Sequence, residues 1–182
     1  MRSLIFVLIS FIMMASSAQA SVIQYTNKAA WEAAVPSHST IDFVGPVHGI
    51  PINTQYYDSH GITFAPGNWA WNDGEFFGLL AQPGSRFYFD TPRHAVAVDF
   101  IGSVVFNLYY KGMLTFTSVQ FWDHPSMFAG LVSDEPFDEV YLYRIIGSQL
   151  VVYDDLHFGL PIPAPGALGV FALAAFGCRR RR

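Results

Sequence analysis

Cysteine is almost missing from this chain of 182 residues, and the one that is present, Cys178, lies four residues before the C-terminal Arg182. The body of the chain therefore has no internal disulfide, and paired-cysteine metal or redox motifs are excluded. Phosphate-binding glycine loops, His-Glu-x-x-His zinc motifs and Gly-x-Ser-x-Gly elbows are missing as well. Most common enzyme classes consequently lack their sequence signatures here.

Basic residues are also scarce in the central part of the chain. Between residues 21 and 160, five lysines and arginines stand against fourteen aspartates and glutamates, a formal balance of −9. An acidic surface repels nucleic-acid phosphates. We therefore expect no nucleic-acid partner.

The first 20 residues have the pattern of a secretory signal peptide. Arg2 is followed by the apolar run from Leu4 to Met14, and then by the small residues Ala18 and Ala20 on either side of Gln19. This is the tripartite order that signal peptidase cleaves after a small-x-small motif. The sequence predicts export and cleavage after Ala20.

Residues 161–182 form a second segment that we separate from the central domain. A proline-rich start leads into the uncharged apolar stretch from Ala167 to Cys178, and the chain ends in arginines: Arg179, Arg180, Arg181 and Arg182. A helix of that length rises about 18 Å, less than the roughly 30 Å of a bilayer core. Terminal arginines favour the cytoplasmic side, which predicts a transient inner-membrane anchor on an exported protein.

This order of proline motif, short apolar helix and arginine cluster resembles the PEP-CTERM sorting signal of exported bacterial proteins. Pro163, Ala164 and Pro165 stand where most of that family has Pro-Glu-Pro, so the chain resembles a variant of the signal. The resemblance implies a C-terminal hydrophobic sorting helix and an exosortase-like processing enzyme as partner. It also implies a location in the cell envelope, on the cell surface or in the extracellular matrix.

The central segment, residues 21–160, predicts an all-β domain with one short helix. Thr26 or Asn27 can cap a helix from Lys28 to Ala34, which Pro36 would stop. Beyond it, short runs of alternating apolar residues are separated by turn residues, which is typical of an antiparallel β-sandwich or jelly roll. After a first strand at Val22 to Tyr25, the expected strands are Thr40 to Val44, Gly61 to Phe64, Glu75 to Leu79, Ser85 to Asp90, Ala95 to Ile101, Val104 to Tyr110, Leu114 to Trp122, Met127 to Val132, Glu139 to Ile145 and Leu150 to Phe158.

The same segment resembles, more loosely, the sandwich modules common in PEP-CTERM proteins. The similar stretches are Thr40 to Phe43, Gly61 to Phe64, Ser133 to Val140 and Asp154 to Gly159. They imply the fold but no activity, because one fold serves many functions.

Three carboxylates are candidate calcium ligands. Asp42 lies in the first sandwich strand, and Asp154 and Asp155 lie in the last. In jelly rolls such oxygen ligands can hold a structural Ca²⁺. The alternative is that they are ordinary solvated carboxylates.

Trp69 and Trp71 are the candidate binding residues. They alternate within Gly67 to Gly74, so on an extended, loop-like projection they would share a face and offer a platform for a sugar ring. The alternative is that both indoles fill the core.

These observations favour a non-catalytic exported protein of the cell envelope or extracellular matrix that binds an envelope polysaccharide. The alternative is a carbohydrate-active enzyme of jelly-roll fold, with Glu75 or Glu135 as acid. A third interpretation is structural self-association in a matrix. No catalytic residue is predicted, and calcium is the only cofactor considered.

Overall fold

The computed structural model describes residues 21–43, 49–52, 60–72, 77–81, 84–122, 127–145 and 151–160. The predicted signal peptide and the sorting segment both lie outside these residues. Within them, the chain is an antiparallel β-structure with one short helix, which confirms the predicted fold class.

The N-terminal elements agree with the sequence prediction. Strand β1 spans Val22–Tyr25 and helix α1 spans Lys28–Ala34. The Asn27 side chain caps the helix, because its Oδ1 accepts a hydrogen bond from the Ala30 N–H at 2.9 Å. The helix ends at Ala34, just before Pro36, whose ring cannot continue it.

The remaining elements are strands of very different lengths. They are β2 Ser37–Ile41, β3 Ile62–Phe64, β4 Asn68–Asn72, β5 Phe77–Ala81, β6 Ser85–Ile101, β7 Ser103–Tyr110, β8 Met113–Thr117, β9 Phe121–Trp122, β10 Phe128–Tyr143 and β11 Val151–Leu160.

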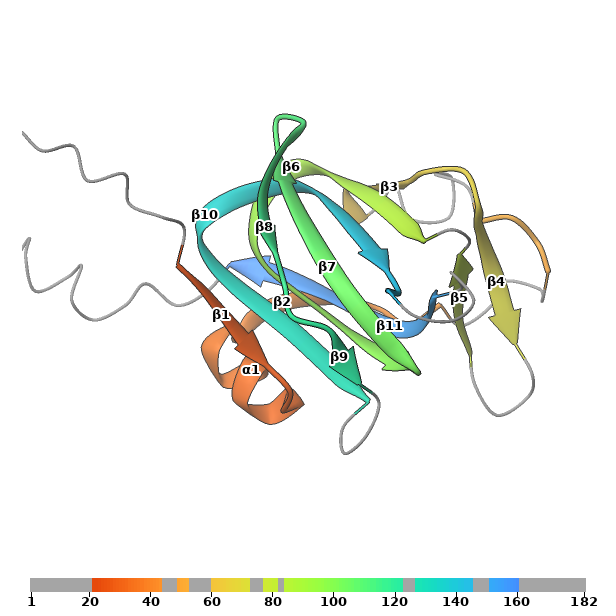
Figure 1. The fold of residues 1–182 in the computed structure, drawn as a ribbon, viewed down its shortest axis with the longest axis horizontal. Coiled ribbons are helices and arrows are strands. Elements are labelled where there is room, and N and C mark those ends of the chain that lie inside the picture. Colours follow the sequence, from red (N-terminus) through yellow and green to blue (C-terminus); the bar gives the residue numbers. More distant parts are fainter. Residues whose placement is uncertain are drawn as a thin grey trace, which may run out of the picture.

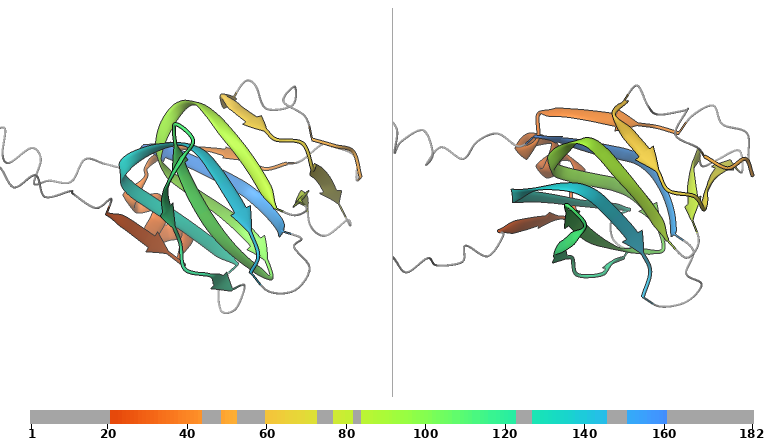
Figure 2. Two further views of the ribbon diagram at one scale, coloured as in Figure 1. Left: turned by 45° about the horizontal axis from the view of Figure 1, so that its top comes forward. Right: turned by 90° about the horizontal axis from the view of Figure 1, so that it is seen from above.

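Strands β6 and β10 are long and curved, and each takes part in both layers of the sandwich (Figure 1). In the first sheet, the N-terminal part of β6 pairs with β3 and with the C-terminal part of β10, which in turn pairs with β7 and then β8. In the second sheet, the C-terminal part of β6 pairs with β11 and with the N-terminal part of β10. Strands β1, β2, β5 and β4 complete this second sheet. Figure 2 shows how the two long strands bend from one layer to the other.

The sequence predicted two short strands in place of each of these long ones, and that was wrong. The gaps between the expected strands contain Pro92 and Pro136, and proline cannot donate a ladder hydrogen bond. Both prolines lie at register shifts between β6 and β10, where the ladder is interrupted while the strands continue. Strand β2 begins at Ser37, earlier than predicted, and the run from Leu114 to Trp122 is divided between β8 and β9.

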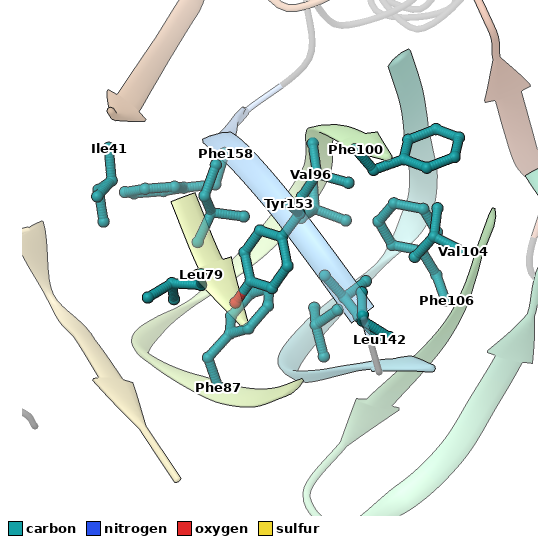
Figure 3. Close-up of a cluster of buried hydrophobic side chains, with 14 of the residues drawn as sticks. Ile41, Leu79, Phe87, Val96, Phe100, Val104, Phe106, Leu142, Tyr153 and Phe158 are labelled. Atoms are coloured by element: carbon teal, nitrogen blue, oxygen red, sulfur yellow. The ribbon is translucent and has the colours of Figure 1, made fainter. Parts of the chain in front are cut away.

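The main core fills the space between the two layers. Side chains from both layers converge there, among them Leu79, Phe87, Phe106, Tyr153 and Phe158 (Figure 3). A second, smaller core lies under α1, where Trp31 and Val35 pack on Ala95, Ala97 and Phe128. The helix therefore covers the outer face of the second sheet.

Candidate functional site

Trp69 lies on a strand rather than on the predicted loop-like projection. Strand β4 pairs with β5 along its whole length. On its other side, residues 49–52 run alongside it, with the Ile52 N–H donating to the Asn68 carbonyl at 2.8 Å and the Ala70 N–H donating to the Ile50 carbonyl at 2.9 Å. The indole is thus carried by a paired backbone, which fixes its position.

Beside Trp69 is a pocket of about 640 Å³, which we call the Trp69 pocket. Its two large exposed aromatic residues are Trp69 and Tyr88, which are 42% and 37% exposed. Phe64 and Ile52, both buried, contribute to the lining. The described lining residues are Pro51, Ile52, Thr63, Phe64, Ala65, Pro66, Gly67, Trp69 and Tyr88.

A buried polar network anchors the pocket to both sheets. The Asn68 side chain is 1% exposed; its amide Nδ2 donates to the Ala65 carbonyl at 2.7 Å, and its Oδ1 accepts from the Ser85 hydroxyl. Ser85 is also hydrogen-bonded to the hydroxyl of Tyr153 on β11. Because buried polar groups are costly to leave unpaired, this network holds β4 in one place relative to β6 and β11.

Trp69 is 42% exposed, so it does not fill the core, which was the alternative interpretation. Its role in binding stays a prediction. Trp71 lies two positions after Trp69 on β4, which is the spacing that the sequence predicted for two residues on one face. Its side chain lies outside what the structure describes. Tyr88 was not predicted. It comes from β6, opposite Thr63 on β3, and no local sequence signal links it to Trp69.

Of the three predicted calcium ligands, Asp155 belongs to a group of side chains with metal-ligand spacing, together with Asp99 and His157, whereas Asp42 and Asp154 do not belong to that group. Asp154 and Asp155 lie in β11 at a register shift against β6, and Asp155 adopts a left-handed backbone with φ 43°. Asp42 follows β2 and is exposed. The negative charges of Asp155, Asp99 and Asp42 all act on the carboxyl of Asp154.

A lysine and a histidine that the sequence analysis did not select also belong to this region. Lys28 Nζ lies 2.7 Å from Asp99 Oδ2 and 3.3 Å from Asp155 Oδ2. His157 Nε2 lies 3.5 Å from the same Asp99 oxygen, and its Nδ1 is 2.8 Å from Thr40 Oγ1. We call Lys28, Asp99, Asp155 and His157 the Lys28 cluster.

Burial and hydrogen bonds shift the pKa values of two carboxyls in this region, in opposite directions. Burial raises the pKa of Asp154 to about 6, with help from the charges of the neighbouring carboxylates and against a hydrogen bond from the Asp155 N–H. Burial also acts to raise the pKa of Asp99, but hydrogen bonds from His157 and Lys28 outweigh it, and that pKa lies below its ordinary value. Lys28 is the cation that compensates Asp99 and Asp155.

The carboxyl and ring nitrogen atoms of Asp99, Asp155 and His157 lie within 4.8 Å of one another, which is the arrangement of a metal-ligand group. The Lys28 ammonium lies at the two carboxylates of this group. His157 itself is 2% exposed and packs against the rings of Trp31, His38 and Phe128. The geometry therefore supports a structural role for the histidine, as a link between the small core and the acidic side chains.

Neither of the carboxylates considered for an enzyme is among the described residues that line the Trp69 pocket. Glu75 lies outside the described residues. Glu135, in β10, is exposed, and no carboxylate or histidine is found among the described residues that line the pocket. The described lining instead offers ring faces, the Thr63 hydroxyl and backbone groups.

The residues predicted for processing, Ala18, Ala20, Pro163 to Pro165 and Arg179 to Arg182, lie outside the described part of the chain. Among the residues that are described, no helix has the length and apolar character needed to cross a membrane.

No protein-family model and no curated protein matches this chain. A solved structure of a mutant family 29 carbohydrate-binding module, studied for its mechanism of ligand recognition, is similar in fold. It is 11% identical, with a TM-score of 0.40, and the match covers 70% of this chain and 98% of that one.

Proposed function

We propose that this chain is an exported, non-catalytic protein that binds glycans at the Trp69 pocket. The observation that carries the proposal is the exposed indole of Trp69 beside the exposed phenol of Tyr88 over a largely apolar pocket of about 640 Å³. Aromatic faces pack well on the apolar face of a sugar ring, and a few polar groups fix its orientation. Thr63, opposite Tyr88, supplies one such group.

The backbone around the pocket supports binding without rearrangement. Trp69 is held by strand pairing on both sides, and the Ala65 N–H donates to the Arg86 carbonyl at 2.9 Å, which ties the residues after β3 to β6. A site that is formed before its ligand arrives loses less entropy on binding.

Affinity electrophoresis tests the proposal. The purified full-length chain is run through gels containing hydroxyethylcellulose, xylan, amylose or dextran, and at least one of them should retard it. Trp69→Ala and Tyr88→Ala should weaken that binding at least tenfold, because each removes a ring face from the pocket. Trp122→Ala is the matched control, since Trp122 is 53% exposed on β9, away from the pocket. Equal loss in the control would contradict the proposal, and so would no retardation in any gel.

We also propose that the two terminal segments direct the protein to the envelope, where an exosortase-like enzyme removes the tail. A 12-residue apolar segment flanked by four arginines would stall in the inner membrane with the motif from Pro163 to Pro165 at its outer boundary. Intact-mass analysis of the native protein should give a species that begins at Ser21 and lacks Cys178 and the terminal arginines. A native species that still carries Arg182 would overturn the processing step.

A further inference from the structure

A row of aromatic and polar side chains continues from the Trp69 pocket across the first sheet. In the strand register, Tyr88 lies opposite Glu139, and Glu139 lies opposite Tyr109. In the neighbouring row, Arg86, Tyr141, Asn107 and Thr117 lie opposite one another on β6, β10, β7 and β8.

Cross-strand partners share one face of a sheet, and residues two apart on a strand do so as well. Because Arg86 and Tyr88 are two residues apart on β6, both rows lie on the same face. We call Arg86, Tyr88, Asn107, Tyr109, Glu139 and Tyr141 the tyrosine face. The residues that alternate with them, including Phe87, Leu108, Val140 and Leu142, are buried in the main core. The tyrosine face is therefore the outer face of the first sheet.

Contacts among these side chains hold them in a defined arrangement. The Arg86 guanidinium carbon lies 5.0 Å from the ring centre of Tyr141 and 5.4 Å from that of Tyr109. Arg86 Nη1 is 2.9 Å from Glu139 Oε1. The Arg86 guanidinium, whose side chain is 40% exposed, thus lies against two rings and is held by the mostly buried Glu139. A planar donor beside aromatic rings is a combination that can bind sugar hydroxyls next to a sugar face.

The tyrosine face is continuous with the pocket through Tyr88, which belongs to both. From β3 to β8, five neighbouring strands span about 19 Å at about 4.8 Å per strand spacing. This distance gives room for several sugar units in a row. A site that held a single sugar would need only the pocket.

Charge narrows the class of glycan. Arg86 and Glu139 compensate one another on the tyrosine face, and the central segment as a whole has a formal balance of −9. A polyuronate would meet repulsion from this domain, whereas an uncharged chain would not.

We infer that the Trp69 pocket and the tyrosine face form one extended site that binds an internal run of an uncharged, linear polysaccharide. This inference rests on the proposed function, and it adds a separate claim about the length and the charge of the glycan. Binding should strengthen with chain length, and it should depend on residues several strands away from the pocket.

The experiment measures, by titration calorimetry, the affinity of the full-length chain for the gel-positive polysaccharide and for its disaccharide. Tyr109→Ala and Tyr141→Ala should weaken polysaccharide binding at least tenfold and leave disaccharide binding within twofold. Tyr109→Phe should keep most of the affinity, because the ring remains. Tyr110→Ala is the matched control, since Tyr110 follows Tyr109 on β7 and points to the other side of the strand.

The outcomes separate the two claims. If Trp69→Ala removes binding while the Tyr109 and Tyr141 variants behave like Tyr110→Ala, the extended site is overturned and the pocket stands. If the tyrosine variants lose binding and Trp69→Ala does not, the pocket is overturned. Stronger binding of polygalacturonate than of every uncharged polysaccharide would overturn the assignment of ligand class, and no binding at all would overturn both claims.

Discussion

Strand β6 presents two different outer faces along its length. In the first sheet its outward side chains are Arg86 and Tyr88, which are large and partly exposed. In the second sheet they are Ala95 and Ala97, which are buried. The small residues are there because α1 packs on them, whereas the large ones lie on a face that carries no helix among the described elements.

Strand β10 repeats this contrast. Its outward residues in the first sheet include Glu139 and Tyr141, whereas in the second sheet Gly130 lies against Trp31. A Cβ on Gly130 would lie 2.5 Å from the Trp31 ring, so only glycine fits under the helix. The size of the outward-pointing residues therefore differs between the two faces. Small residues indicate a face that another element covers, and aromatic residues with polar partners indicate a face available to a ligand.

The largest expected difference is in the free energy of unfolding, between an alanine substitution at the covered Trp31 and one at the exposed Trp69. Trp31→Ala should cost about 3–5 kcal/mol of unfolding free energy, because Trp31 is fully buried and its Nε1 donates to the Leu131 carbonyl at 3.2 Å. Trp69→Ala should cost less than about 1 kcal/mol, because its ring is exposed. Urea denaturation measures both values. Equal losses would place Trp69 in the core and remove the basis of the pocket.

The second prediction concerns the ion pairs that fasten α1 to the second sheet. Lys28→Met should cost about 1–2 kcal/mol near neutral pH, because it leaves Asp99 and Asp155 without their cation in a partly buried place. Lys111→Met is the control, since Lys111 lies over the exposed end of the β7–β8 hairpin near Tyr110. Urea denaturation of the two variants measures the difference. A Lys28 variant as stable as the control would show that the helix is held by its apolar contacts, among them Trp31 and Val35, without help from the ion pairs.

The sequence could predict whatever depends on local pattern. Helix α1 and strand β1 have the predicted bounds, because capping, alanine content and alternation act within a few residues. The choice of Asp154 and Asp155 was also local, and the structure places them among other acidic residues. Asp99 was missed because it lies inside an apolar strand, 56 residues from Asp155, and only the pairing of β6 with β11 brings them together. Tyr88 was missed for the same reason.

The third prediction uses the raised pKa of Asp154. Because that pKa is about 6 in the folded chain against an ordinary 3.8, the protonated carboxyl stabilises the fold at low pH, and this contribution is lost as pH rises through 6. Since the Asp154 carboxyl is half-buried, its contribution to the free energy of unfolding should change by at most about 1 kcal/mol over this pH range. Urea denaturation between about pH 4.5 and 7 measures it. Asp154→Asn should remove this part of the pH dependence, and an unchanged profile would contradict it.

Calcium should give the smallest effect, and it remains a prediction from Asp42, Asp154 and Asp155. Lys28 already compensates Asp99 and Asp155, so an added cation would act mainly on the charge that raises the pKa of Asp154. A ligand near its dissociation constant stabilises by about 0.4 kcal/mol, which corresponds to a rise of about 1–2 °C in Tm for a domain of this size. Differential scanning calorimetry with millimolar CaCl₂ at pH 7 measures the shift.

Two variants decide whether this shift comes from the acidic residues themselves. Asp155→Ala should abolish it, while Glu135→Gln, an exposed change on β10, should leave it intact. Lys28→Met should enlarge it, because removing the internal ammonium leaves two more carboxylate oxygens for the ion. An enlarged shift would identify Lys28 as the competitor of the metal. No shift in either the native chain or Lys28→Met would leave Asp42, Asp154 and Asp155 as ordinary carboxylates.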